Sequence, residues 1–198
     1  VTPGRIPDNG CWSCYFDLLR KKSWNSKAIE TLNRSTTCIL NHLTDPKSSI
    51  KKPIKGLVIG YVQSGKTANF TALIAKAIDV GYRFIVVLSG RTDILRDQTQ
   101  ARLDMELLGW ESLSEQEKEI YKNKLGRHNP NYESKFVTYK HLDEPIKFNR
   151  LTGYKKDFDA GSIASLPLTN TPYIAVLKKN PKRLAEFANS LGKSTWRK

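Results

Sequence analysis

Residues 60–67 read GYVQSGKT, and this stretch decides the fold that the sequence predicts. It matches the Walker A pattern G-x-x-x-x-G-K-[ST] at every position. Gly60 and Gly65 let the backbone turn so tightly that successive N–H groups point at phosphate oxygens, and a following helix adds the partial positive charge of its first turn. The stretch therefore predicts a phosphate-binding loop.

The side chains of the loop predict its ligand. Lys66 would reach the β- and γ-phosphates of a nucleotide, and the Thr67 hydroxyl would be a ligand of Mg²⁺, which prefers hard oxygen donors. We therefore expect ATP and Mg²⁺ as cofactors. The predicted nucleotide-binding residues are Gly60, Gln63, Ser64, Gly65, Lys66 and Thr67. The alternative is a strand–turn–helix that carries a basic residue by chance.

The residues around the loop predict a strand before it and a helix after it. Leu57-Val58-Ile59 is an apolar run without polar alternation, typical of a strand covered on both faces in a parallel sheet. A helix is expected from about Lys66 to Val80, with Gly81 where a C-terminal cap belongs. The predicted buried stripe of this helix comprises Phe70, Leu73, Ile74, Ala77 and Ile78.

Two later apolar runs continue the alternation. Residues 84–88 are expected to be a buried strand, followed by a helical stretch to about Leu108, and residues 173–177 a further strand. The second leads into a helix over residues 182–191, which Asn180-Pro181 opens as N-cap and first helical residue. The predicted class is α/β, a P-loop NTPase (RecA-like) parallel sheet flanked by helices.

The domain organisation follows from the same patterns. Apolar residues recur at helical spacing from Ser26 to Leu43, so residues 1–50 are expected to be an N-terminal helical segment. Residues 51–198 would form the P-loop ATPase core, incomplete and with an irregular insertion at about 111–170. Within that insertion we expect a helical piece near 114–124 and a strand at 136–139.

Basic residues follow the predicted strands. In a parallel sheet ligands gather at the carboxyl ends of the strands, so these residues would share an edge with the phosphate loop. Gln98 falls on an otherwise apolar helix face, where a buried amide must find a partner or face a cleft. The predicted nucleic-acid-binding residues are Arg91, Arg96, Gln98, Lys178 and Lys179. The alternatives are a solvated helix start and, for Gln98, a satisfied core amide.

Composition supports a polyanionic partner. The chain has 198 residues with 33 Lys and Arg against 19 Asp and Glu, a net charge of +14, which favours DNA. No apolar run approaches the roughly 18 residues that span a bilayer. Three cysteines cannot pair completely and no secretory signal is visible, so a cytoplasmic protein is expected. The missing initiator Met suggests a fragment.

Two further patterns allow a zinc or base-stacking interpretation, but we expect neither. A zinc set would comprise Cys11, Cys14, Cys38 and His42. Free Cys, however, usually packs as a small apolar residue. Aromatic residues near the N-terminus could stack on nucleic-acid bases, but packing onto the helix at 26–43 is the stronger expectation. They are Trp12, Tyr15, Phe16 and Trp24.

A phosphate loop alone does not hydrolyse ATP, because an acidic residue at the end of another apolar strand must hold Mg²⁺ and align water. Asp143-Glu144 is the nearest candidate, but Lys140 and His141 interrupt the run before it. Asp157 and Asp159 follow Lys-rich chain. The catalytic residues are therefore unassigned, and we expect the acidic strand beyond Lys198 and an inactive chain in its absence.

Three segments resemble the Z1 domain family. They read GYVQSGKTANF at 60–70, DxGYR at 79–83 and LRxQTQxRLD at 95–104, and the resemblance covers about 24–109 and 173–191. Further matching residues are Ser35-Thr36, Ile39-Leu40, Leu43, Asp45-Pro46 and Lys178-Lys179-Asn180. This family is similar to superfamily-two helicases and occurs in bacterial candidate endonucleases of restriction-like and anti-phage defence systems.

The resemblance implies an ATP-dependent enzyme that acts on DNA. Lys66 and Thr67 would bind the nucleotide, and Gln98 and Arg102 would lie in the segment after the second strand. An acidic Asp-Asp-Glu-Ala-type strand and a second motor domain would follow Leu191, and a nuclease would be a further domain or partner. The expected function is the ATP-binding lobe of a helicase-like ATPase. The alternatives are a small-molecule or nucleotide kinase and a nucleotide-regulated binding module without hydrolysis.

Overall fold

The computed structural model describes residues 6–49, 52–59, 65–108, 147–167 and 169–193. Contacts divide the chain into two compact units, Val1–Tyr82 and Arg83–Lys198. The second unit contains a small parallel sheet with helices around it, so the predicted mixed α/β class is confirmed. The boundary predicted after residue 50 stays a prediction.

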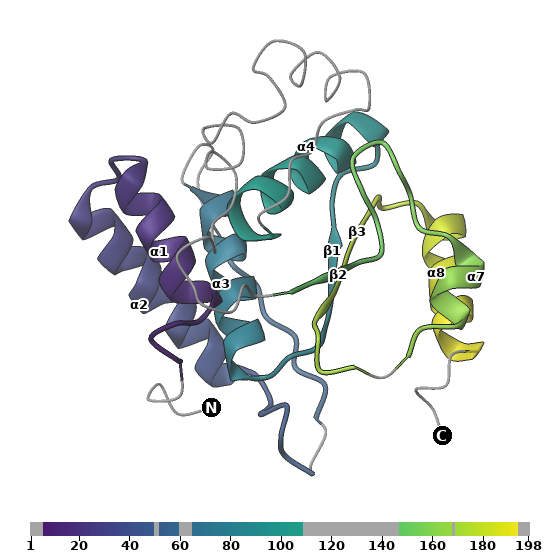
Figure 1. Cartoon of the computed structure of the whole chain (residues 1–198), viewed down its shortest axis with the longest axis horizontal. Coiled ribbons are helices and arrows are strands. Elements are labelled where there is room, and N and C mark those ends of the chain that lie inside the picture. Colours follow the sequence, from purple (N-terminus) through teal and green to yellow (C-terminus); the bar gives the residue numbers. More distant parts are fainter. Residues whose placement is uncertain (1–5, 50–51, 60–64, 109–146, 168, 194–198) are drawn as a thin grey trace, which may run out of the picture. The chain divides into compact units, whose positions relative to one another are not determined.

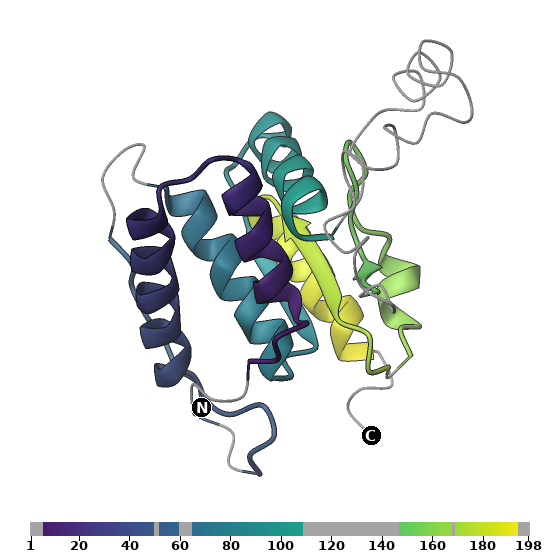
Figure 2. The same cartoon turned by 60° about the vertical axis from the view of Figure 1, so that its left-hand side comes forward.

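The described part of the first unit consists of three helices packed side by side, α1 (Cys11–Lys21), α2 (Ser26–His42) and α3 (Lys66–Val80) (Figure 2). The helix predicted at 26–43 is α2, and it begins where Asn25 accepts a hydrogen bond from the Lys27 amide at 2.9 Å. A side-chain oxygen at this position satisfies one of the N–H groups that the first turn leaves without a partner.

The helix α3 has the bounds that the sequence predicts. It ends at Gly81, which has a φ of +112° and closes the helix in the left-handed conformation. Ile74, Ala77 and Ile78 of the predicted stripe are buried, whereas the other two members, Phe70 and Leu73, are half-buried. Ala77 and Val80 pack with Leu40 of α2 in a small apolar cluster.

The helix α1 lies within the predicted N-terminal helical segment, although its bounds were not predicted, and its first turn is held by α3. The Asp79 carboxylate accepts hydrogen bonds from the Cys11 amide at 2.7 Å and the Trp12 amide at 2.9 Å. A Cβ at Gly10, the residue before α1, would lie 2.6 Å from Asp79 Oδ1, so a side chain at this position would displace the capping carboxylate. Burial raises the pKa of Asp79. A carboxylate distant in sequence thus caps α1, which local patterns cannot show.

The second unit has a three-stranded parallel sheet in the order β1-β3-β2 (Figure 1). Its strands are β1 (Phe84–Leu88), β2 (Asn149–Arg150) and β3 (Tyr173–Leu177). The strands predicted at 84–88 and 173–177 are confirmed. The central strand β3 is buried along its whole length. Val86 and Leu88 of β1 are 38% and 47% exposed, so the prediction that the strand at 84–88 is buried is wrong.

Helices surround this sheet within the second unit. They are α4 (Asp93–Leu103), a π-helical turn η2 (Asp104–Leu108), α7 (Ala160–Ala164) and α8 (Pro181–Lys193). The helical stretch predicted up to Leu108 corresponds to α4 and η2. The predicted start of the last helix is also confirmed, because Asn180 Oδ1 accepts from the Arg183 amide at 3.2 Å and Pro181 is the first helical residue.

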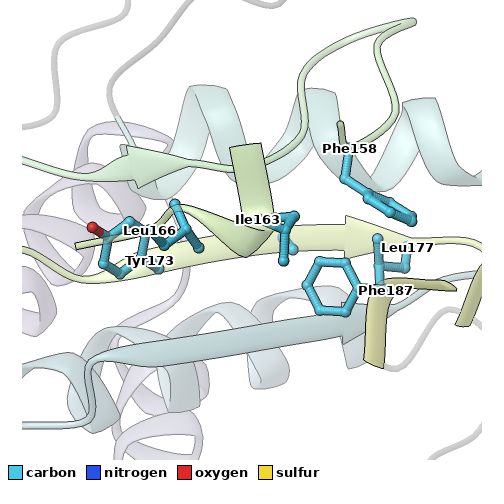
Figure 3. Packing of buried hydrophobic residues seen from close by; sticks show 7 residues of the cluster. Phe158, Ile163, Leu166, Tyr173, Leu177 and Phe187 are labelled. Carbon is cyan, nitrogen blue, oxygen red and sulfur yellow. The ribbon is translucent and has the colours of Figure 1, made fainter. Parts of the chain in front are cut away.

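An apolar cluster joins β3 to α7 and α8 (Figure 3). The rings of Phe158 and Phe187 meet edge to face, with their centroids 5.0 Å apart, next to Leu177. The other buried members are Ile163, Leu166, Tyr173 and Ala175. The mostly polar sequence at 147–167 has no clear strand or helix pattern, so β2 and α7 were not predicted.

The strand predicted at Leu57–Ile59 is absent. These three residues lie outside any strand, and their side chains are 85%, 54% and 87% exposed. Apolar composition does not make a strand unless a neighbour pairs with its backbone groups. The helix predicted near 114–124 and the strand predicted at 136–139 lie outside the described residues.

Within the described residues, no helix has both the length and the apolar character needed to cross a membrane.

Candidate functional site

The described end of the predicted phosphate loop is the junction between Gly65 and α3. Gly65 has φ of +76° and ψ of +23° and is the N-cap residue of α3. An L-residue with a side chain would be strained by about 1–2 kcal/mol in this left-handed conformation, and glycine is not. The prediction that Gly65 provides a tight turn into the helix is confirmed.

Lys66 and Thr67 are the first two residues of α3, with Lys66 exposed and Thr67 half-buried. Gly65 has no side chain that could cap the helix, and the first turn contains no acidic residue. The amino end of this 15-residue helix therefore combines its partial positive charge with one ammonium group and one hydroxyl group. Such an arrangement favours an anion.

Only part of the predicted loop can be compared with the structure. The predicted ligands Gly60, Gln63 and Ser64 lie outside the described residues. Because Leu57–Ile59 is not a strand, the strand half of the expected strand–loop–helix context is wrong. The helix half is correct.

A second group of predicted residues meets at the carboxyl ends of β1 and β3. The Ser89 amide donates to Leu177 O at 2.8 Å, and the Lys179 amide donates to Gly90 O at 3.1 Å, which brings the two strand ends together. Arg91 and Lys179 are exposed there. We call Arg91, Lys178 and Lys179 the basic edge. Its three members come from two segments that are far apart in sequence.

The charge of Lys178 is shared with an acidic residue. Its Nζ lies 2.6 Å from Asp93 Oδ1, and this contact holds the pKa of Asp93 below its usual value. The Asp93 side chain is 71% exposed, so the pair is a surface ion pair and contributes little to stability. Arg91 and Lys179 remain the more available cations for a polyanion at this edge.

Arg96 was predicted to contact nucleic acid, but the structure places it inside the second unit. Its side chain is buried, and its guanidinium donates to Gly153 O at 3.1 Å and to Lys156 O at 3.2 Å. It also contacts the carboxylate of Asp97, which accepts from the Lys155 amide. Arg96 therefore fastens the turn at 153–156 onto α4. This arrangement disfavours a nucleic-acid contact and gives Arg96 a structural role.

Gln98 is exposed, so it is not the satisfied core amide that was one of its two interpretations. The buried amide of α4 is Gln100, which the sequence analysis did not single out. Gln100 Nε2 donates to Asp104 Oδ1 at 2.8 Å, and Thr152 Oγ1 donates to Gln100 Oε1 at 2.7 Å.

The network around Gln100 connects the sheet to α4. Thr152 Oγ1 also accepts from the Val176 amide of β3 at 2.8 Å. At the other end Arg150 Nη1 donates to Asp104 Oδ2 at 3.1 Å, so the buried Asp104 carboxylate has a cationic partner. Such a connected network fixes the relative position of its elements because each broken link leaves a buried polar atom unsatisfied.

The first unit contains a buried cation that was also missed. Lys76 of α3 is fully buried, and its Nζ donates to Asn33 O, Asn33 Oδ1 and Thr37 Oγ1 at 2.8, 2.6 and 2.7 Å. The ammonium also lies 4.3 Å from the centroid of the Trp12 ring. Burial lowers the pKa of Lys76 to about 8. No helical periodicity distinguishes such a lysine from an exposed one.

The zinc interpretation gains nothing from the structure. Cys11 and Cys14 are buried in α1, whereas Cys38 is exposed on α2. The imidazole of His42 contacts Cys38 O at 2.7 Å. Among the described residues, no group of three or more Cys, His, Asp or Glu side chains could hold a metal ion.

Both acidic candidates that lie in the described chain have structural partners. Asp157 forms an ion pair with Arg183 at 3.0 Å. Asp159 caps α7, where its Oδ2 accepts from the Ser162 amide at 2.7 Å, and this hydrogen bond lowers its pKa. Asp143-Glu144 lies outside the described residues. The catalytic acid therefore stays unassigned.

Comparisons with known proteins add no assignment, since no family model, no curated protein and no solved structure matches this chain. The likeness to the Z1 domain family is carried by the residues quoted above and stays a prediction.

Proposed function

We propose that this chain binds ATP with Mg²⁺ at residues 60–67 and forms the nucleotide-binding lobe of a helicase-like ATPase that acts on DNA. The observation that carries the proposal is the left-handed Gly65 at the start of α3, followed at once by Lys66 and Thr67. This is the geometry that the Walker A sequence requires at its last three positions.

The physical argument concerns the first turn of α3. The N–H groups at the start of a helix can donate to an anion, and Gly65 has no side-chain oxygen that would compete for them. A phosphate oxygen is a suitable acceptor, and the Lys66 ammonium neutralises its charge. The Thr67 hydroxyl would then bind Mg²⁺, whose chemistry is to neutralise charge that develops on the phosphates.

The DNA part of the proposal is supported by the basic edge and by the net charge of +14. Arg91 and Lys179 are exposed on two segments whose backbones are joined by the Gly90–Lys179 hydrogen bond at the end of the sheet. Cations on two adjoining segments suit the phosphates of a nucleic-acid backbone. The Z1 resemblance further leads us to propose a bacterial defence system in which the ATPase acts with a nuclease.

Calorimetric titration with Mg-ATP tests the nucleotide part. Lys66→Met should weaken binding at least about tenfold, because it removes a charge-assisted hydrogen bond to phosphate. Lys55→Met is the matched control, since Lys55 is an exposed lysine of the segment before the loop and should leave the affinity unchanged. Equal affinity of Lys66→Met and the unchanged chain would contradict the proposal.

Fluorescence anisotropy with single- and double-stranded DNA at several salt concentrations tests the DNA part. The double variant Arg91→Ala/Lys179→Ala should lower the slope of log affinity against log salt by about 2, one unit for each lost phosphate contact. Arg83→Ala is the control, because Arg83 is exposed before the amino end of β1. If Arg83→Ala has the larger effect, or if DNA does not bind, the basic edge is not a DNA site.

A further inference from the structure

The turn between α1 and α2 lies at the same end of the first unit as the start of α3 (Figure 2). Trp24 belongs to this turn, and its ring atom Cη2 lies 3.8 Å from the position that a Cβ on Gly65 would occupy. An aromatic ring therefore lies beside the residue that opens the candidate phosphate site, at the position that a side chain of this residue would reach. The sequence separation of 41 residues gives no sign of this proximity.

Trp24 is held in place on both sides by the backbone. Its own amide donates to Leu19 O at 3.1 Å, and the next residue, Asn25, caps α2. Ser23 before it has a φ of +56°, which turns the chain sharply after α1. The ring is therefore presented by an ordered turn, and it nevertheless remains 37% exposed. A tryptophan that only fills the core would bury more of its surface.

The charges of the same turn suit a nucleotide. Arg20, Lys21 and Lys22 are exposed at the end of α1, directly before Trp24. A flat apolar ring beside basic groups and an anion-binding helix end matches the two parts of a nucleoside triphosphate, its base and its phosphates.

A buried hydroxyl group on α3 provides an independent observation. Thr71 Oγ1 is buried and has no hydrogen-bond partner in the described part of the chain. Thr71 follows Thr67 by one helical turn on the same face, and the Cα–Cβ bonds of a helix tilt towards its amino end. A buried hydroxyl without a partner costs stability, so its presence below the helix start indicates that a ligand or its bound water completes the site.

We propose that Trp24 forms a wall of the nucleotide site and stacks on the base of the nucleotide whose phosphates bind at Gly65–Thr67. This inference rests on the proposed function and extends it to selectivity. Stacking recognises the flat face that all bases share, so the site requires a base but discriminates weakly between adenine and guanine. Binding of the phosphates should not depend on Trp24.

Calorimetric titrations with Mg-ATP, Mg-GTP and Mg-tripolyphosphate separate these contributions. Trp24→Ala should weaken ATP and GTP about tenfold and leave tripolyphosphate unchanged, whereas Trp24→Phe should keep most of the affinity. Trp12→Phe is the control, because Trp12 lies at the other end of α1 against Lys76 and should affect all three ligands alike or not at all. Tryptophan fluorescence quenched by ATP should lose its largest component in Trp24→Phe.

Two results overturn the inference while leaving the proposed function intact. In the first, the unchanged chain binds tripolyphosphate as tightly as ATP. In the second, Trp24→Ala weakens tripolyphosphate and ATP equally, which means that Trp24 only supports the turn. If the unchanged chain binds none of the three ligands, the proposed function itself fails and the inference fails with it.

Discussion

The buried ammonium of Lys76 makes the stability of the first unit depend on pH. Burial lowers the pKa of this lysine from 10.5 in the unfolded chain to about 8 in the folded one. Between these two pH values the unfolded chain binds more protons than the folded chain, so the free energy of unfolding rises with pH. At about 1.4 kcal/mol per pKa unit, the rise amounts to about 3 kcal/mol.

Lys76→Met isolates this contribution. Methionine keeps an unbranched side chain of similar length but carries no charge, so the variant lacks the titration of Lys76 and keeps that of every other group. Urea unfolding followed by circular dichroism at pH values from about 7 to about 10.5 gives the free energies of unfolding of the unchanged chain and of the variant. The free energy of unfolding of the unchanged chain minus that of Lys76→Met should rise by about 3 kcal/mol across this range.

The reasoning is refuted if that difference is flat or falls as the pH rises. A fall would mean that the hydrogen bonds to Asn33 and Thr37 and the contact with the Trp12 ring stabilise the charged form by more than burial destabilises it. The folded pKa would then lie above that of the unfolded chain, and the stability would be greatest at low pH.

Three further substitutions test separate parts of the fold by urea unfolding. Thr71→Val removes a buried hydroxyl without a partner and should stabilise the nucleotide-free chain by about 1 kcal/mol, so a loss of stability would show that the hydroxyl is satisfied. Thr152→Val leaves Gln100 Oε1 without its donor and the Val176 amide without its acceptor, and should cost about 3 kcal/mol, whereas a cost below about 1 kcal/mol would contradict the network. Asp79→Ala removes the cap of α1 and should lower the free energy of unfolding by about 2 kcal/mol, with loss of helical signal. Asp79→Asn should retain part of the stability. Equal losses in the two variants would mean that the cap does not cause the loss of stability.

The helices and strands that the sequence predicted well are those whose signals are local. In α3, apolar spacing sets the buried face, Gly65 starts the helix and Gly81 ends it, so its bounds follow from neighbouring residues. The strand β3 is apolar at all five positions and lies in the centre of the sheet, where such a run is buried on both faces.

The features that the sequence could not show depend on contacts between distant residues. The helix α1 begins where Asp79 caps it, and β2 forms where Asn149–Arg150 pairs with β3. In both cases the partner is distant in sequence. The apolar run at Leu57–Ile59 shows the opposite error, since its composition predicts a strand but no pairing is present among the described residues.

The candidate site divides in the same way. The Walker A pattern predicted the turn at Gly65 and the helix that starts at Lys66, because both are local features of the motif. The burial of Arg96 was not predicted because its partners at residues 153–156 lie almost 60 positions further along the chain. The position of the Trp24 ring beside Gly65 was missed for the same reason.

The most direct test of the central claim is the change in backbone amide signals when Mg-ATP is added to isotope-labelled protein. We predict that the largest shifts fall on the amides of residues 60–69, with Gly65, Lys66 and Thr67 among them, and that Lys66→Met greatly reduces them. Shifts confined to other residues, or no shifts at saturating nucleotide, would show that the amino end of α3 does not hold a triphosphate.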